Sequence, residues 1–136
     1  MRHVFADTGY WIAVLDPRDE LHHLAKQVSQ NLGQCRLITT EMVLTELLNF
    51  FADRPDRNNI AAAAVDAVMR DPNTEVVPQT SLQFRDAFAR YKARPDKGWS
   101  LTDCASFLIM EQRVIPEALA YDHHFEQAGF KALLRG

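Results

Sequence analysis

Four acidic side chains stand at places in the sequence from which they could act together on a phosphate ester. Two of them, Asp7 and Asp122, follow short apolar runs that have the character of β-strands. The other two, Glu46 and Asp103, lie within segments of helical periodicity. Each also has an ordinary structural explanation, because an Asp after a strand often begins a turn or caps a helix, and a Glu at the edge of an apolar face reaches for water or an ion pair. A shared catalytic role for the four acids therefore requires that the fold bring them together.

The two helical acids differ in their surroundings. Glu46 lies about 40° from Phe50 and about 60° from Val43 around the helix axis, at the border of the apolar face. Burying its charge there is costly unless a cation or a hydrogen-bond donor meets it. Ser100 and Asp103 fit a capping pattern, in which the hydroxyl accepts from the first turn and the acid reaches back. A structural role for Asp103 is therefore as well founded as a chemical one.

Four carboxylates gathered within a few ångströms would carry a charge of about −4, which requires protonation or a divalent cation. A set of oxygen donors without His or Cys suits Mg²⁺ or Mn²⁺ better than Zn²⁺. Such an ion lowers the pKa of a bound water, polarises a phosphoryl oxygen and offsets charge on the leaving oxygen. If the acids meet, their chemistry predicts hydrolysis of a phosphodiester bond.

The elements that must carry these acids alternate between strands and helices. Apolar runs predict strands over residues 3–6, 36–40, 75–78, 118–121 and, shorter, 130–134. Helical spacing and caps predict helices over residues 10–15, 21–32, 41–52, 56–70, 81–94 and 101–111. Because parallel strands need a crossover of about a dozen residues, we expect a three-layer α/β/α sandwich with a central parallel sheet of about five strands. We expect one domain over residues 1–136, with Asp7 and Asp122 at the strand ends where ligands of such sheets collect.

Length and composition exclude several classes of protein. The 136 residues, 47% hydrophobic and 24% charged, have an ordinary globular composition. The longest apolar runs, residues 10–15 and 60–65, are six residues each, whereas a helix needs about 20 to cross a bilayer. The two cysteines, Cys35 and Cys104, are far apart and predict reduced thiols rather than disulfides or a zinc site. No secretory pattern opens the sequence, so we expect a cytoplasmic protein without a membrane segment.

The net charge of −3 conceals a basic stretch. Residues 85–97 hold five basic side chains against two acidic ones, a local excess of +3. Arg90, Lys92 and Arg94 are candidates for binding the phosphates of a nucleic acid, with aromatic side chains nearby that could stack a base. The alternative is a solvated helix end whose basic residues complement the helix dipole, and the sequence favours neither.

The segments around the four acids resemble the motifs of PIN-domain nucleases, and among these the VapC-type toxins of toxin–antitoxin pairs. In order, the matching segments are Phe5–Ala13, Thr45–Asn49, Ser100–Cys104 and Tyr121–Phe125. The resemblance implies a PIN-like fold and an endoribonuclease that depends on one or two Mg²⁺ or Mn²⁺ ions. It implies a metal site made by Asp7, Glu46, Asp103 and Asp122.

The same resemblance assigns roles to further residues. Thr8 would help place a water or a phosphate at the metal, and Asp96 and Ser100 would lie in the outer shell of the site. His124 could contact a phosphate, although a packed or solvated imidazole is the alternative. The family often has a hydroxyl residue two positions before its fourth acid, and here that position is Ala120.

The resemblance also implies a homodimer and a small antitoxin protein that silences the RNA-cleaving site. Two other functions stay open. A PIN-like module that only binds a partner protein is disfavoured because all four acids are retained. An α/β phosphatase is disfavoured because Gly9, rather than a second acid, stands two residues after Asp7.

Overall fold

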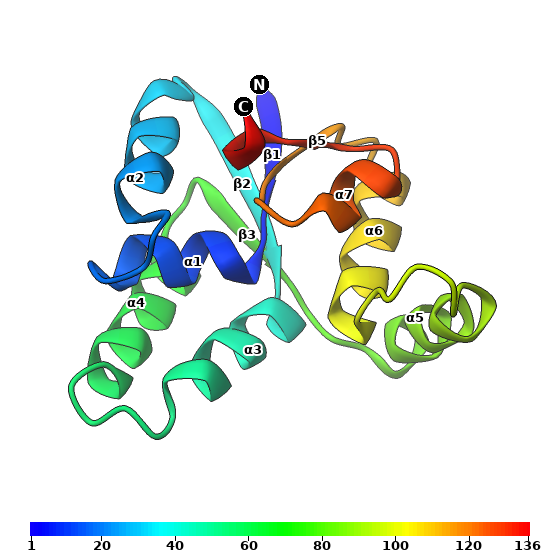
Figure 1. The fold of residues 1–136 in the computed structure, drawn as a ribbon, viewed down its shortest axis with the longest axis horizontal. Coiled ribbons are helices and arrows are strands. Elements are labelled where there is room, and N and C mark those ends of the chain that lie inside the picture. Colours follow the sequence, from blue (N-terminus) through cyan, green and yellow to red (C-terminus); the bar gives the residue numbers. More distant parts are fainter.

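A computed structural model describes all 136 residues and shows a five-stranded sheet with helices on both faces (Figure 1). The strands are β1 (Arg2–Ala6), β2 (Cys35–Thr40), β3 (Thr74–Val77), β4 (Glu117–Leu119) and β5 (Lys131–Ala132). The helices are α1 (Thr8–Leu15), α2 (His22–Asn31), α3 (Glu41–Phe51), α4 (Asn58–Arg70), α5 (Ser81–Ala93), α6 (Leu101–Arg113) and α7 (His123–Gln127). A 3₁₀ turn, Leu133–Arg135, follows β5.

Every strand pair is parallel, and the strand order is β3-β2-β1-β4-β5. The chain builds β2 and β3 on one side of β1 and then crosses to build β4 and β5 on the other. The order therefore reverses between β1 and β4, and such a reversal opens a crevice for ligands beyond the carboxyl ends of the two strands. The backbone N–H of Asp7 donates to the carbonyl of Leu119 over 3.2 Å, which ties the exits of β1 and β4 together.

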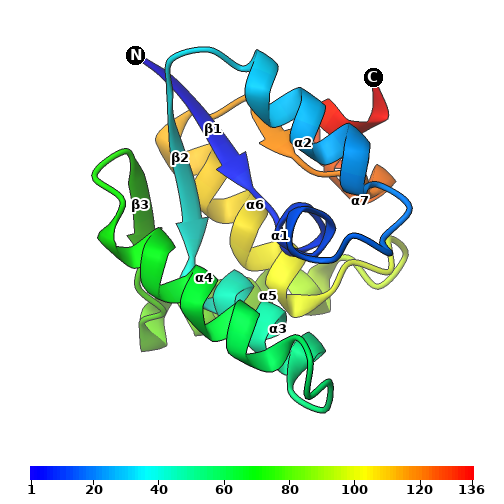
Figure 2. The same cartoon turned by 90° about the vertical axis from the view of Figure 1, so that its left-hand side faces the viewer.

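The helices form the two outer layers of the predicted sandwich, and the three-layer prediction is confirmed. In Figure 1, α1, α2 and α4 lie on one side of the sheet, α6 and α7 lie on the other, and α5 packs outside α6. Figure 2 shows the arrows of β1, β2 and β3 running the same way, with α3 and the beginning of α1 beyond their carboxyl ends. No helix combines the length and the apolar character that crossing a membrane requires.

The core fixes the helices that carry the acids against the central strand. Residues 4–6 of β1 are fully buried, as expected for a parallel strand covered on both faces. Phe107 of α6 and Phe125 of α7 meet edge to face with 5.0 Å between ring centroids, and Phe125 also lies 6.5 Å from Phe5 of β1. These three buried rings connect the helix of Asp103 and the helix after Asp122 to the strand that ends at Asp7.

The predicted elements agree with the structure apart from their ends and one helix. Helix α1 begins at Thr8, two residues before the predicted start, because Asp7 already serves as its N-cap residue. Strand β4 ends at Leu119 rather than residue 121, and the predicted last strand is a two-residue β5 followed by the 3₁₀ turn. The prediction missed α7, whose five residues are too few to show helical spacing. Cys35 and Cys104 are both free thiols, as predicted.

Candidate active site

The structure places the four acids around the carboxyl ends of β1 and β4. Asp7 leaves β1 and Asp122 follows β4, while Glu46 comes from the middle of α3 and Asp103 from the first turn of α6. The negative charges of the other three acids each raise the pKa of Asp7, so the four carboxylates are close enough to interact. The fold thus brings together residues that are far apart in the sequence.

Asp7 experiences this concentration of charge most strongly. Its pKa rises from 3.8 to about 7, chiefly because the carboxyl group is removed from water, and next because the charge of Asp103 lies nearby. The backbone N–H of Thr8 opposes the rise, and the charges of Glu46 and Asp122 add to it. Asp7 is the N-cap residue of α1, yet its side chain makes no capping hydrogen bond. Helix capping therefore does not account for this acid.

Glu46 is held by a neighbour from another helix rather than by water or an ion pair. The hydroxyl of Thr8, a buried residue, donates to Oε1 of Glu46 over 2.5 Å. Helix α3 itself is fixed at its start by Thr40, whose hydroxyl accepts from the N–H of Val43 over 3.1 Å, as the sequence predicted. Glu46 is therefore a positioned carboxylate at the border of a buried helix face.

Asp103 has the structural role that the sequence predicted, and it also lies close to the other acids. It forms the predicted capping box, in which the Ser100 N–H donates to Oδ2 of Asp103 over 3.0 Å and the Asp103 N–H donates to the Ser100 hydroxyl over 3.0 Å. Nδ1 of His124 lies 3.2 Å from the same Oδ2. Desolvation by burial raises the pKa of Asp103, the Ser100 N–H opposes this, and the charge of Asp122 raises it further. Capping thus orients this acid without isolating it from the others.

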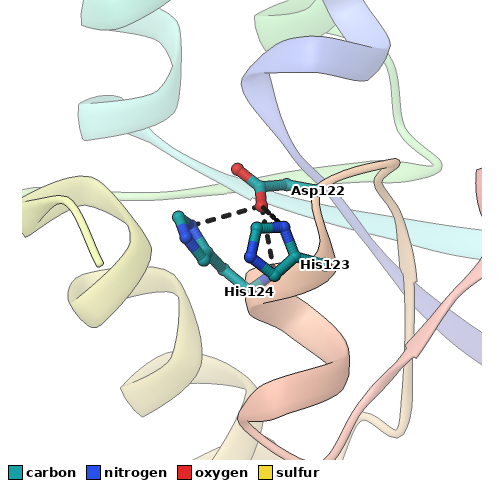
Figure 3. A group of neighbouring side chains, drawn as sticks. All are labelled: Asp122, His123 and His124. Atoms are coloured by element: carbon teal, nitrogen blue, oxygen red, sulfur yellow. Dashed lines mark hydrogen bonds and ion pairs between the residues drawn. The ribbon is translucent and has the colours of Figure 1, made fainter. Parts of the chain in front are cut away.

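His124 lies between the third and the fourth acid. The Asp122 side chain caps α7, since its Oδ1 accepts from the His124 N–H over 3.0 Å. Nδ1 of the His124 ring lies 3.2 Å from that same oxygen, and Nδ1 of His123 lies 3.3 Å from it (Figure 3). The side chain of His124 is 18% exposed and that of Asp122 is 43% exposed. The imidazole therefore faces both acids instead of packing in the core.

Three of the four acids use one carboxylate oxygen for positioning and leave the other without a hydrogen bond. The occupied oxygens are Oε1 of Glu46, Oδ2 of Asp103 and Oδ1 of Asp122. The remaining oxygens of these acids and the carboxylate of Asp7 lie close to one another's negative charge, and the imidazoles of His123 and His124 are the neighbouring side chains that could carry a positive charge. Unpaired carboxylate oxygens are the donors that Mg²⁺ and Mn²⁺ prefer, so the residues present fit such an ion.

A second arrangement of metal-ligand type overlaps this one. Asp122, His123 and His124 each offer one donor atom, and these atoms all lie within 4.8 Å of one another (Figure 3). This group mixes nitrogen and oxygen donors and is more exposed than Asp103. The group shares Asp122 with the acidic site. It is therefore a second arrangement of side chains beyond the end of β4 that could bind a metal ion.

The basic stretch does not present its side chains as one free track. Arg90 forms a bidentate pair with Glu111, with N···O distances of 2.7 and 2.8 Å. Nζ of Lys92 lies 4.6 Å from the centre of the Phe88 ring and makes no ion pair. Of these two side chains, only Lys92 keeps its charge available to a phosphate.

Arg94 and Asp96 interact with each other at the end of α5. The Arg94 guanidinium pairs with Asp96 over 3.3 Å and lies 5.3 Å from the centre of the Trp99 ring. Asp96 is also 4.0 Å from Nζ of Lys97, and none of its contacts reaches the four acids. Arg94, Trp99 and Ser100 line one hollow, which places this basic segment beside the beginning of α6.

The PIN domain model matches residues 4–131 of the sequence. This chain belongs to the PIN-domain family. The 23S rRNA-specific endonuclease VapC20 of Mycobacterium tuberculosis, from strains CDC 1551 and H37Rv, is 27% identical over 127 residues, which cover 93% of this chain and 95% of the relative. The crystal structure of M. tuberculosis VapC20, described as a sarcin–ricin loop cleaving toxin, is similar to this PIN-domain chain with a TM-score of 0.83 and 26% identity, covering 93% of this chain and 95% of that one. The predicted family and fold are both confirmed.

The sequence alone did not reveal how His124 is used in this PIN-domain chain. A signal was present, because Asp122 is followed two residues later by His124, and a capping Asp accepts from the N–H at that spacing. Such a cap brings the side chain of the second residue back toward the acid. The sequence also gave no reason to select Tyr121 or Arg135, which line a hollow together with Asp122.

Proposed function

We propose that this PIN-domain chain is a metal-dependent endoribonuclease and the toxin of a toxin–antitoxin pair. The observation that carries the proposal is the placement of four acids from separate elements around the carboxyl ends of β1 and β4, where the charges of the other three raise the pKa of Asp7. A protein without a cation here would hold unneutralised charge in a partly buried place, which is costly. Membership of the PIN-domain family supports the same function.

The metal site is proposed on the chemistry of the donors. Mg²⁺ or Mn²⁺ would be held by Asp7, Glu46, Asp103 and Asp122. When bound, the ion supplies Lewis-acid activation of water and neutralises charge that develops on the phosphate. The free carboxylate oxygens favour these hard ions over ions that prefer sulfur or nitrogen.

The other residues of the site orient these acids. The Thr8 hydroxyl holds Oε1 of Glu46, and hydrogen bonds of this kind commonly set the orientation and affinity of metal ligands. The Ser100 N–H does the same for Oδ2 of Asp103. His124 directs Nδ1 toward Asp103 and Asp122, so Nε2 is the ring nitrogen left to contact a substrate phosphate.

The substrate that we propose is RNA, bound by its phosphates at the acidic crevice and along the end of α5. Lys92 is the strongest candidate of the basic stretch because it makes no ion pair, and Arg94 would need to exchange Asp96 for a phosphate. The relatives' names direct the first test to 23S ribosomal RNA and its sarcin–ricin loop. We propose no outer-shell role for Asp96, because its side chain pairs with Arg94 and Lys97.

We further propose that the protein acts in the cytoplasm, as a homodimer that a small antitoxin silences. Family membership supports these partners. Helix α5 exposes a set of large apolar side chains that could take part in such contacts, namely Leu82, Phe84 and Phe88. Sedimentation of the purified protein, alone and with the product of an adjacent short reading frame, tests both partnerships.

The decisive test of the function compares the wild type with Asp7→Asn. We expect the wild type to cleave the 23S RNA of intact ribosomes in the presence of Mg²⁺ or Mn²⁺. Primer extension on this RNA should then stop at a single position near the sarcin–ricin loop. Asp7→Asn, with the same circular dichroism spectrum, should lose this cleavage, and EDTA should abolish it in the wild type. Equal cleavage by both proteins would indicate a contaminating nuclease and contradict the proposal.

A further inference from the structure

A second hollow is lined in part by Asp122, the fourth of the acids. It has a volume of about 540 Å³, within the range of about 300–1,000 Å³ typical of small-molecule sites. Its charged and polar lining consists of Asp19, Asp122, His123, His124 and Arg135. Its apolar lining comes from Ile12, Leu21, Phe50 and Tyr121. The hollow is therefore a partly apolar groove whose lining includes one of the four acids, Asp122.

An aromatic ring and a guanidinium are held together in this groove. The ring of Tyr121 is half exposed, and the guanidinium carbon of Arg135 lies 5.1 Å from its centre. Nη1 of Arg135 donates to the Tyr121 carbonyl over 3.0 Å, and Nε lies 3.0 Å from Oε1 of Glu126. The buried neighbour Leu134 donates its N–H to the Ala120 carbonyl over 3.1 Å, which attaches the 3₁₀ turn to the same segment. Both planar groups are thus fixed before any ligand arrives.

We propose that this groove, which we call the Tyr121 groove, binds one unpaired nucleobase of the RNA strand next to the phosphate that the acids engage. The proposal rests on the proposed function. The base would stack on the face of the Tyr121 ring that Arg135 leaves free, while the Arg135 guanidinium supports the ring from the other side. Unpaired bases in RNA are recognised in this way, on aromatic faces and guanidinium planes.

Continuity with the acidic crevice is the reason to choose a nucleobase as the occupant. Tyr121 and Asp122 are consecutive, so a strand whose phosphate reaches Asp122 carries its adjoining base into the Tyr121 groove. The lining suits a base because it offers apolar surface together with one guanidinium, that of Arg135, while Asp19 and Asp122 would repel an anionic ligand that lacked a metal. A base contact of this kind would give the enzyme a preference for the nucleotide beside the cleaved bond.

The experiment measures RNA binding without cleavage. Single-stranded fluorescent oligomers of uridine, cytidine and adenosine, and an abasic ribose-phosphate chain of the same length, are titrated with Asp7→Asn protein in Mg²⁺. The titrations are repeated with Tyr121→Ala, Tyr121→Phe or Arg135→Gln added to that protein. Ile60→Ala is the matched control, because Ile60 is a large apolar side chain that is 43% exposed, close to the 49% of Tyr121, and lies on α4, which carries none of the four acids.

We expect Tyr121→Ala to weaken the best-bound oligomer about 5- to 100-fold, the range for loss of one base–aromatic stack. Tyr121→Phe, which keeps an aromatic ring at this position, and Ile60→Ala, which leaves Tyr121 unchanged, should stay within about twofold of the parent. The abasic chain should bind the parent and Tyr121→Ala alike, and the salt slope should not change, because stacking involves no phosphate. Arg135→Gln should weaken the oligomers that contain bases more than the abasic chain.

Three results would overturn the proposal. One is equal affinity of Tyr121→Ala and the parent for every oligomer, which would mean that the groove binds no base and would favour a protein segment as its occupant. Another is an equal loss for the abasic chain, which would indicate a general structural effect. The third is a parent protein that does not distinguish bases from the abasic chain. These results are distinct from a failure of the proposed function. A protein that binds bases through Tyr121 but cleaves no RNA would contradict the proposed nuclease activity and leave the base-binding groove supported.

Discussion

Thr8 and Glu46, 38 residues apart in the sequence, are joined by a 2.5 Å hydrogen bond from the Thr8 hydroxyl to Oε1 of Glu46. The bond connects the first residue of α1 to the middle of α3. Because Thr8 directly follows Asp7, the same contact fixes the second acid relative to the first. Glu46 is thus oriented beside the acid at the end of β1 before a metal binds.

Removing this contact should loosen the metal site without unfolding the protein. Thr8→Val keeps the shape of the side chain and deletes the hydroxyl, so Glu46 loses its donor. We expect Mn²⁺ affinity to fall about 10- to 100-fold, the usual effect of losing a partner that orients a metal ligand. Titration of Mn²⁺ followed by electron paramagnetic resonance measures this loss.

Thr8→Ser is the matched control, because it keeps the hydroxyl and should bind Mn²⁺ nearly as the wild type does. Both variants should give the wild-type circular dichroism spectrum. If Thr8→Val bound Mn²⁺ as tightly as Thr8→Ser, Glu46 would not depend on this hydrogen bond.

The stability of the metal-free protein should fall as the pH rises. The pKa of Asp7 in the folded chain is about 7, above the unfolded value near 3.8, so the folded chain binds a proton more tightly between these two values. Stability is therefore lost progressively from about pH 4 to about pH 7, by on the order of 4 kcal/mol for this group. Urea unfolding in EDTA at a series of pH values measures the loss, and Mg²⁺ or Mn²⁺ should restore stability at neutral pH.

Asp7→Asn provides the control for this pH dependence, because it cannot acquire the charge. We expect the metal-free variant to be more stable than the wild type at pH 8 and to lose that advantage at about pH 4. A wild-type protein whose stability did not depend on pH over this interval would show that the charge of Asp7 is already neutralised by another means.

The two roles of Asp103 should separate by substitution. Asp103→Asn keeps an oxygen for the Ser100 N–H and removes the charge, so we expect stability to change by less than about 1 kcal/mol while RNA cleavage falls at least about 100-fold. Ser100→Ala should do the opposite and cost about 1 kcal/mol of stability with most of the cleavage retained. Urea unfolding and initial cleavage rates distinguish the two. Similar losses of both quantities in both variants would mean that Asp103 acts only as a cap.

The basic stretch should divide into residues that bind RNA and a residue that stabilises the fold. Lys92→Ala should weaken RNA binding and reduce the salt slope by about 0.7, the value for one phosphate contact with a single strand. Arg90→Ala should leave the slope unchanged, because Arg90 is paired with Glu111, and should cost only about 0.2–1 kcal/mol of stability for this exposed pair. Fluorescence titrations at several salt concentrations provide the slopes. A reduced salt slope of RNA binding in Arg90→Ala would show that Arg90 contacts a phosphate of the RNA.

Most of the strands and helices could be predicted from the sequence, because they have clear periodicities and caps. Thr40 and Ser100 cap their helices as predicted, and the acids follow the strand ends or occupy helices that reach them. The strand order could not be predicted, because it depends on which apolar faces pack together. Helix α7 was missed because so few residues show no helical period.

The candidate site was predictable in its acids and less so in its contacts. Motifs identify which carboxylates could meet, but a hydrogen bond such as that between Thr8 and Glu46 depends on how two helices pack. The pairing of charged side chains could not be predicted either. Arginine is a residue type that often binds phosphates, and only the structure shows that Arg90 is paired with Glu111. The pairing of Tyr121 with Arg135 arises from the packing of the 3₁₀ turn and has no pattern in the sequence.

The central claim is that side chains from four different elements share one divalent ion. The most direct measurement is an anomalous difference map from crystals soaked in Mn²⁺, recorded at the manganese absorption edge. We predict a peak within coordination distance of Asp7, with Asp103 and at least one of the other two acids as further ligands. A peak only at Asp122, His123 and His124, or no peak at a Mn²⁺ concentration that supports RNA cleavage, would contradict the account.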